Sequence, residues 1–97
     1  MTAKKNNTPE MKALRNEIDA IDNKLLPLMV KRSHLVEKAL ELKTNRSDIV
    51  DKKRINEITK KITQRTKKLG GNAKLLSEIW LSIINSFIEF EKSKFKK

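Results

Sequence analysis

A long N-terminal stretch of the chain carries apolar residues at intervals that alternate between three and four. They are Met11, Leu14, Ile18, Ile21, Leu25 and Leu28, and the series resumes at Leu35, Ala39 and Leu42. This spacing is typical of an amphipathic α-helix with a narrow apolar stripe. The pattern predicts one helix from Pro9 to about Thr44, and a helix of that length is roughly 54 Å long.

Three basic residues occupy notable positions on this predicted helix. Arg32 continues the apolar stripe, and a buried guanidinium is costly unless an anion meets it. Lys43 follows eleven residues later, on nearly the same face and roughly 16 Å further along, whereas Arg15 is rotated by about 100°. The arrangement indicates a pocket for a small, multiply charged anion. The alternative is an arginine whose charged head reaches solvent from the stripe.

The composition favours one all-helical domain. The 97 residues include only two glycines and two prolines, too few for many tight turns. Cysteine is absent, which fits a cytoplasmic protein. The sequence has neither the apolar core of a signal peptide nor an apolar run of transmembrane length, so we expect no membrane association.

The net charge of +11 predicts an anionic partner, either a small acid or a nucleic acid. Aromatic residues make up only 4% of the chain and no base-reading motif occurs, which argues against a nucleic-acid-binding helical module. A coiled-coil adaptor is disfavoured because Arg32 interrupts the stripe. Most lysines are interpreted as a solvated basic surface. The single histidine, His34, has no ligand partners nearby in sequence, so no metal site is expected.

Local signals predict where the first helix begins and bends. Thr8 supplies a capping hydroxyl, Pro9 suits the first turn, and Glu10 suits the positive end of the helix dipole. Pro27 should bend the helix, but the apolar stripe stays in phase on both sides of it. We therefore expect one kinked helix rather than two.

Two further helices follow a short loop at residues 45–47. Asp48 or Asp51 caps the second helix, Gly70-Gly71 ends it, and Asn72 caps the third. The second stripe is Ile55, Ile58, Ile62 and Leu69, and the third is Leu76, Trp80, Ile83 and Phe87, extended by Glu91. These boundaries predict a disordered lead at residues 1–8, a helical domain at 9–93 and a basic tail at 94–97.

The length of the first helix predicts the assembly. A compact chain of this size has a radius of gyration of only about 13 Å, so one copy cannot cover such a helix on both sides. A symmetric contact between two long helices can. We expect an intertwined homodimer with two equivalent sites, in which Arg15 serves the pocket of the partner.

Several segments together resemble the all-helical chorismate mutase family. They are Leu14-Arg15-Asn16-Glu17-Ile18-Asp19-Ala20-Ile21-Asp22, Leu25-Leu26, Lys31-Arg32, Lys43, Asp51-Lys52-Lys53-Arg54, Ile79-Trp80 and Ile83-Ile84. The resemblance covers about residues 9–93, and its most specific part is the spacing of Arg15, Arg32 and Lys43 by seventeen and eleven. It implies an intertwined homodimer with shared sites that converts chorismate to prephenate in aromatic amino acid biosynthesis, without cofactor or metal.

The resemblance also implies roles for individual residues. Arg32, Arg54 and the Arg15 of the partner subunit would bind the substrate, with Arg32 and Arg15 on its carboxylates. Lys43 would donate to the ether oxygen. Glu91 would face the same oxygen and must be protonated to donate. Asp51 is a candidate both for capping the second helix and for binding the substrate.

Two positions depart from the family pattern. Ile55 stands where a glutamate usually helps to hold the ring hydroxyl, and Phe87 stands where a serine is common. Both changes make the pocket more apolar, unless these residues are simply part of the core. Isochorismate pyruvate lyase, a close relative that makes salicylate and pyruvate, is apolar at corresponding positions and is the main alternative. A mutase acting on the 4-amino analogue of chorismate is a third possibility.

Overall fold

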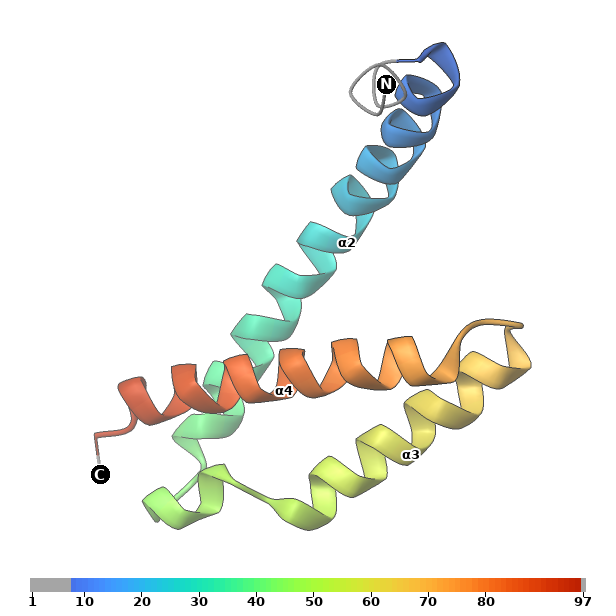
Figure 1. Ribbon diagram of the computed structural model, residues 1–97. Helices are drawn as coiled ribbons and strands as arrows, with labels where there is room; N and C mark the ends of the chain where they lie inside the picture. Colours follow the sequence, from blue (N-terminus) through green and yellow to red (C-terminus); the bar gives the residue numbers. More distant parts are fainter. Residues whose placement is uncertain (1–7, 97) are drawn as a thin grey trace. The chain divides into compact units, whose positions relative to one another are not determined.

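The computed structural model describes residues 8–96, so most of the predicted disordered lead lies outside the described residues. The elements are α2 (Pro9–Glu41), the 3₁₀-helix η1 (Arg46–Ile49), α3 (Lys52–Lys68) and α4 (Ala73–Lys94) (Figure 1). No strand occurs between residues 8 and 96. The prediction of an all-α chain with three main helices is confirmed.

The chain divides into two compact units, residues 1–35 and 36–97. Helix α2 supplies the described part of the first unit and ends inside the second. The second unit contains the last turns of α2 together with η1, α3 and α4. Each unit is described by itself below.

Helix α2 begins as its sequence predicts. The Thr8 Oγ1 accepts a hydrogen bond from the Met11 N–H at 3.2 Å, and the Thr8 carbonyl accepts from the Lys12 N–H at 3.0 Å. The helix continues without interruption through Pro27, which confirms one helix rather than two. The bend expected at Pro27 stays a prediction.

The end of α2 differs from the prediction, because the helix stops at Glu41 rather than at about Thr44. The Leu42 N–H donates to the Ala39 carbonyl at 3.1 Å, and the Lys43 N–H donates to the Leu40 carbonyl at 3.0 Å. Both bonds span three residues, so the last turn tightens to a 3₁₀ pattern that ends the α-helix.

In the first unit, the apolar stripe of α2 lies open. Leu14, Ile18, Ile21, Leu25 and Leu28 are each 52–63% exposed. Within the described part of this unit, residues 8–35, α2 has no second element against which to bury such a stripe, although amphipathic helices gain most of their stability from that burial.

The second unit builds a small core around α4. The buried apolar residues are Leu40, Ile49 and Ile84, from α2, η1 and α4 respectively. Helices α3 and α4 are in contact, and they run back from the turn that joins them in roughly antiparallel directions, diverging away from it (Figure 1). A hydrogen bond of 2.8 Å between the hydroxyls of Thr63 and Ser77 joins them.

The turn between α3 and α4 contains Gly70 and Gly71, the two glycines that were predicted to end the helix. Gly70 has a φ of 75°, a left-handed conformation that favours glycine, and the Gly71 N–H donates to the Thr66 carbonyl at 2.9 Å. A Cβ atom on Gly71 would lie 3.0 Å from the Thr66 Cγ2, which leaves little room for a side chain. The Asn72 Oδ1 then accepts from the Leu75 N–H at 3.0 Å, so Asn72 caps α4 as predicted.

The predicted stripe of α3 needs one correction at its end. Leu69 was expected in the stripe but is 78% exposed, because it follows the last helical residue and no longer keeps the helical register. Thr66 is buried instead, and its hydroxyl donates to the Ile62 carbonyl at 2.7 Å. That local bond lets a polar side chain face the helix interface.

Candidate active site

The central feature of the second unit is an ion pair between Lys43 and Glu91. The Lys43 Nζ lies 2.7 Å from the Glu91 Oε2, and the two side chains are 24% and 10% exposed. Lys43 lies two residues beyond the end of α2, and Glu91 lies in the last turn of α4. A short, largely water-excluded contact between opposite charges is stronger than an exposed one.

Lys43 reaches this position by a route that differs from the prediction. The expectation that it shares a helical face with Arg32 assumed a helix that continues past Lys43, and α2 ends before it. The tightened turn after Glu41 directs the chain instead, and the carboxylate of Glu91 holds the ammonium group. The sequence therefore identified Lys43 as a candidate site residue, but the reason given for the direction of its side chain, a helical face shared with Arg32, was wrong.

The two residues that depart from the family pattern are half-buried. Phe87 lies one turn before Glu91 on α4, so the two side chains share a face of that helix. Ile55 lies in the first turns of α3, and its carbonyl accepts from the Thr59 hydroxyl at 2.7 Å. Both positions thus contribute apolar rather than charged surface.

Asp51 and Arg54 meet at the beginning of α3. The Asp51 Oδ1 accepts from the backbone N–H of Arg54 at 3.1 Å, which makes Asp51, rather than Asp48, the cap of this helix. Asp48 instead accepts from the Asn45 N–H at 3.2 Å within η1. Arg54 is exposed, so its guanidinium is open to solvent in the single chain. The proposed binding roles of both residues stay predictions.

The remaining predicted residues, Arg15 and Arg32, belong to the first unit. Both lie on α2, where a separation of seventeen residues turns their side chains about 100° apart. Arg15 is exposed and Arg32 is half-buried. Arg32 is thus less exposed than Leu28 and Leu35, its neighbours in the stripe, which are 63% and 55% exposed.

One contact near the ion pair was not predicted from the sequence. The Arg46 Nη1 donates to the Lys92 carbonyl at 3.2 Å, which joins η1 to the last turn of α4. The sequence shows that Arg46 is a basic residue three positions after Lys43. It does not show that the path of the chain through η1 brings this side chain to the C-terminal end of α4.

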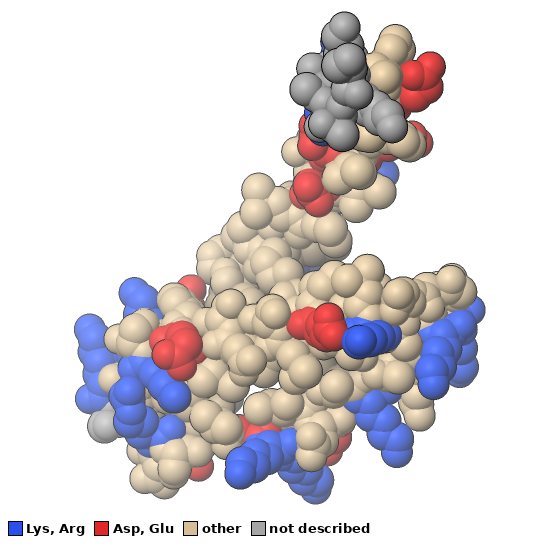
Figure 2. Space-filling view, viewed as in Figure 1, with Lys and Arg blue, Asp and Glu red and all other residues tan. Residues whose placement is uncertain are grey.

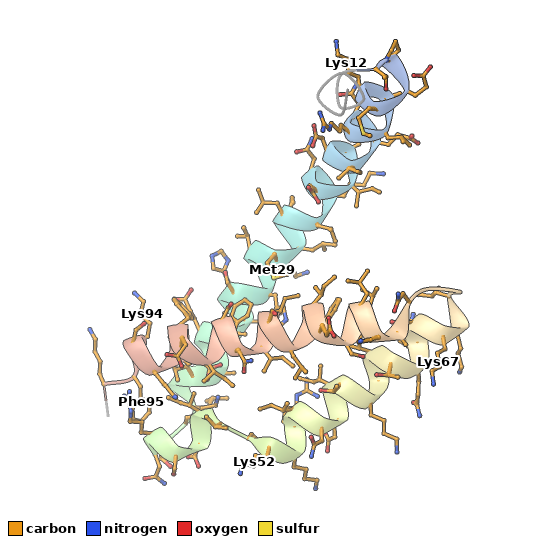
Figure 3. All side chains as sticks on the ribbon, viewed as in Figure 1. Lys12, Met29, Lys52, Lys67, Lys94 and Phe95 are labelled. Carbon is orange, nitrogen blue, oxygen red and sulfur yellow. The ribbon has the colours of Figure 1, made fainter. Side chains whose placement is uncertain are left out.

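The basic surface lies mainly outside this region. Six lysines of α3 are exposed: Lys52, Lys53, Lys60, Lys61, Lys67 and Lys68. Figure 2 shows Lys and Arg side chains along α3 and at both ends of the second unit. Lys52 and Lys67 mark the two ends of α3 in Figure 3. Their exposure agrees with the interpretation of a solvated basic surface, which stays a prediction.

Residues 8–96 hold no metal-binding cluster and no membrane-spanning helix. In that range no group of three or more His, Cys, Asp or Glu side chains is placed to hold a metal ion. His34 is exposed. None of the described helices combines the length and the apolar character needed to cross a membrane.

Comparison with known proteins identifies the family. Neither the curated proteins nor the solved structures contain a match to this chain. The family model for chorismate mutase type II matches residues 14–92, which is most of the chain. This range includes all eight predicted site residues, from Arg15 to Glu91. The chain belongs to the type II chorismate mutase family.

Proposed function

We propose that the protein is a chorismate mutase, which converts chorismate to prephenate. The observation that carries this proposal is the 2.7 Å contact between Lys43 and Glu91 in a largely water-excluded position. It brings together the two groups that the family resemblance assigns to the ether oxygen of the substrate. Membership of the family supports a small-molecule substrate with carboxylate groups.

The reaction is an internal [3,3] rearrangement, in which an ether C–O bond breaks as a C–C bond forms. It requires neither a nucleophile nor a proton transfer, so the protein must hold a compact conformer and stabilise charge on the ether oxygen. Arg32, Arg54 and the Arg15 of the partner subunit would bind the substrate, with Arg32 and Arg15 on the two carboxylates. Lys43 and Glu91 would donate hydrogen bonds to the ether oxygen.

Glu91 can take this part only with a proton on its carboxyl group. In the free protein its Oε2 accepts a hydrogen bond from Lys43. An ether oxygen placed between the two side chains would accept from both, which requires a neutral Glu91. Burial beside a dianionic substrate favours that neutral form.

The proposal includes a homodimer with shared sites. The open apolar stripe of α2 supports it, because two copies of this helix can cover each other along a symmetric contact. The 100° between Arg15 and Arg32 would then direct Arg15 toward the pocket of the other copy. Cytoplasmic location stays a prediction.

Isochorismate pyruvate lyase activity is the second candidate, and Ile55 and Phe87 favour it. Both add apolar surface where the mutase pattern has polar contacts to the substrate. Isochorismate carries its ring hydroxyl elsewhere, so the missing contact would not weaken its binding. The mutase remains our first choice because Glu91 is acceptable in the mutase pattern and the resemblance to that pattern covers most of the chain. A mutase acting on the 4-amino analogue is a weaker third candidate.

One assay separates these candidates. Purified protein is incubated with chorismate and, separately, with isochorismate, and prephenate is resolved from salicylate and pyruvate. We expect prephenate from chorismate to form faster than salicylate from isochorismate. Faster salicylate formation would replace the mutase by the lyase, and turnover of neither substrate would reject both.

A further inference from the structure

The segment between Lys43 and α3 is attached to the same turn of α4 that carries Glu91. Ile49 of η1 is 4% exposed and η1 packs against α4. Within the segment, the Asn45 N–H donates to the Asp48 Oδ2 at 3.2 Å, and the Asp48 N–H donates to the Asn45 carbonyl at 3.0 Å. These bonds fix the shape of η1, so it can act as a rigid connection.

Arg46 makes the polar part of this attachment. Its Nη1 donates to the carbonyl of Lys92, the residue that follows Glu91, at 3.2 Å. The last carbonyls of a helix have no partner within the helix, and a cation near them also interacts favourably with the helix dipole. On the other side, Arg46 lies only three residues after Lys43. The contact thus joins points next to both members of the ion pair.

We propose that Arg46 is a positioning residue that holds Glu91 and Lys43 at the distance needed to address one substrate atom. The expected effect of Arg46 on the reaction rate rests on the proposed function. Arg46 touches backbone rather than the pair itself, so it acts through the placement of α4's last turn. A misplacement of about 1 Å at a reacting group can lower a rate by up to a hundredfold, so a contact of modest strength has a measurable effect.

Three variants separate positioning from a general loss of stability. Arg46→Met keeps the aliphatic stem but removes every donor, and Arg46→Lys keeps a cation that can bond a helix-terminal carbonyl. The matched control is Asn72→Ala, which removes a side-chain cap from the opposite end of the same helix. Thermal unfolding of each variant shows whether Arg46→Met and Asn72→Ala lose similar stability.

Two readouts decide the outcome. The first is the rate with chorismate: we expect Arg46→Met to lower kcat roughly five- to tenfold with little change in KM. Arg46→Lys should recover most of that loss, and Asn72→Ala should leave kcat near the unaltered value. The second is the NMR resonance of the Glu91 carboxyl carbon, assigned with Glu91→Gln. It should shift in Arg46→Met and stay in place in Asn72→Ala.

The proposal is overturned if Arg46→Met leaves the Glu91 resonance unchanged, or if Asn72→Ala moves it equally. It is also overturned if the enzyme is active and Arg46→Met changes KM rather than kcat. A protein that converts neither chorismate nor isochorismate would reject the proposed function instead. In that case the resonance comparison still tests whether Arg46 positions the pair.

Discussion

The two units of this chain differ in how much of their apolar surface is buried. In the second unit, Leu40, Ile49 and Ile84 are buried, and the ion pair is formed within the same unit. Other apolar residues of this unit, such as Leu42 and Leu75, remain exposed. In the first unit, the stripe of α2 is more than half exposed. The second unit therefore has a small core of its own. In the first unit, α2 has an apolar stripe typical of a buried helix, but this stripe is exposed. The exposed stripe of the first unit is the surface that the second copy of the proposed homodimer would cover.

The largest expected effect comes from a charge in the open stripe. Ile21→Asp should prevent association and abolish activity, because the proposed contact between copies would bury an unpaired carboxylate. Sedimentation at micromolar concentration should give twice the chain mass for the unaltered protein and a single chain for the variant. Asn23→Asp, which adds the same charge on the opposite face of the helix, should remain dimeric. An active monomer would contradict the role assigned to the first unit.

The next effect concerns the half-buried cation of the first unit. Arg32→Ala should reduce turnover by more than tenfold while leaving the helical fold intact, since loss of a charge-assisted contact costs at least about 1.5–3 kcal/mol. Circular dichroism and steady-state rates with chorismate measure the two quantities. Retention of normal turnover would favour the alternative in which Arg32 simply reaches solvent.

In the second unit, Lys43→Ala should act mainly on the chemical step. Its contact with the ether oxygen would strengthen as the bond breaks, so kcat should fall more than binding weakens. Single-turnover rates and the substrate dissociation constant separate the two terms. A change in affinity alone would remove Lys43 from the proposed step and leave it as a binding residue.

A smaller effect is expected from pH and tests Glu91. Only the protonated carboxyl can donate, so activity should decrease as pH rises and Glu91 loses its proton in the complex. Glu91→Gln retains a donor without a proton to lose, so this variant should stay active at higher pH. The check is kcat against pH for both proteins, and superimposable profiles would exclude Glu91 from the reaction.

The smallest effect tests the apolar departures. Ile55→Glu should improve the reaction with chorismate by several-fold, because one restored hydrogen bond contributes about 1 kcal/mol. If the enzyme is instead a lyase, the same carboxylate would have no hydroxyl to accept from and should slow salicylate formation. Rates with both substrates, measured side by side, distinguish these results.

Much of the fold followed from local signals in the sequence. Thr8, Asp51 and Asn72 cap helices through one side-chain bond each, and the two glycines end α3, all within a few residues of the signal. Leu69 shows where such reasoning stops, because a stripe extrapolated past the helix end loses its register.

The candidate site was less predictable than the helices. Lys43 and Glu91 were identified as partners in one reaction from the resemblance, but their contact depends on a turn that periodicity does not encode. Arg46 was missed because its acceptor is a backbone carbonyl forty-six residues away, and a backbone atom leaves no mark in the sequence. The buried hydroxyl of Thr66 was missed because its bond is local and satisfies the group without a partner helix.

The open stripe of α2 also has a consequence for how stability should be measured. If a second copy covers it, folding and association are linked by mass action, and the midpoint of thermal unfolding depends on protein concentration. A tenfold dilution would then remove about 1.4 kcal/mol of apparent stability per mole of dimer. Effects of substitutions in the two units are comparable only when all proteins are studied at one concentration.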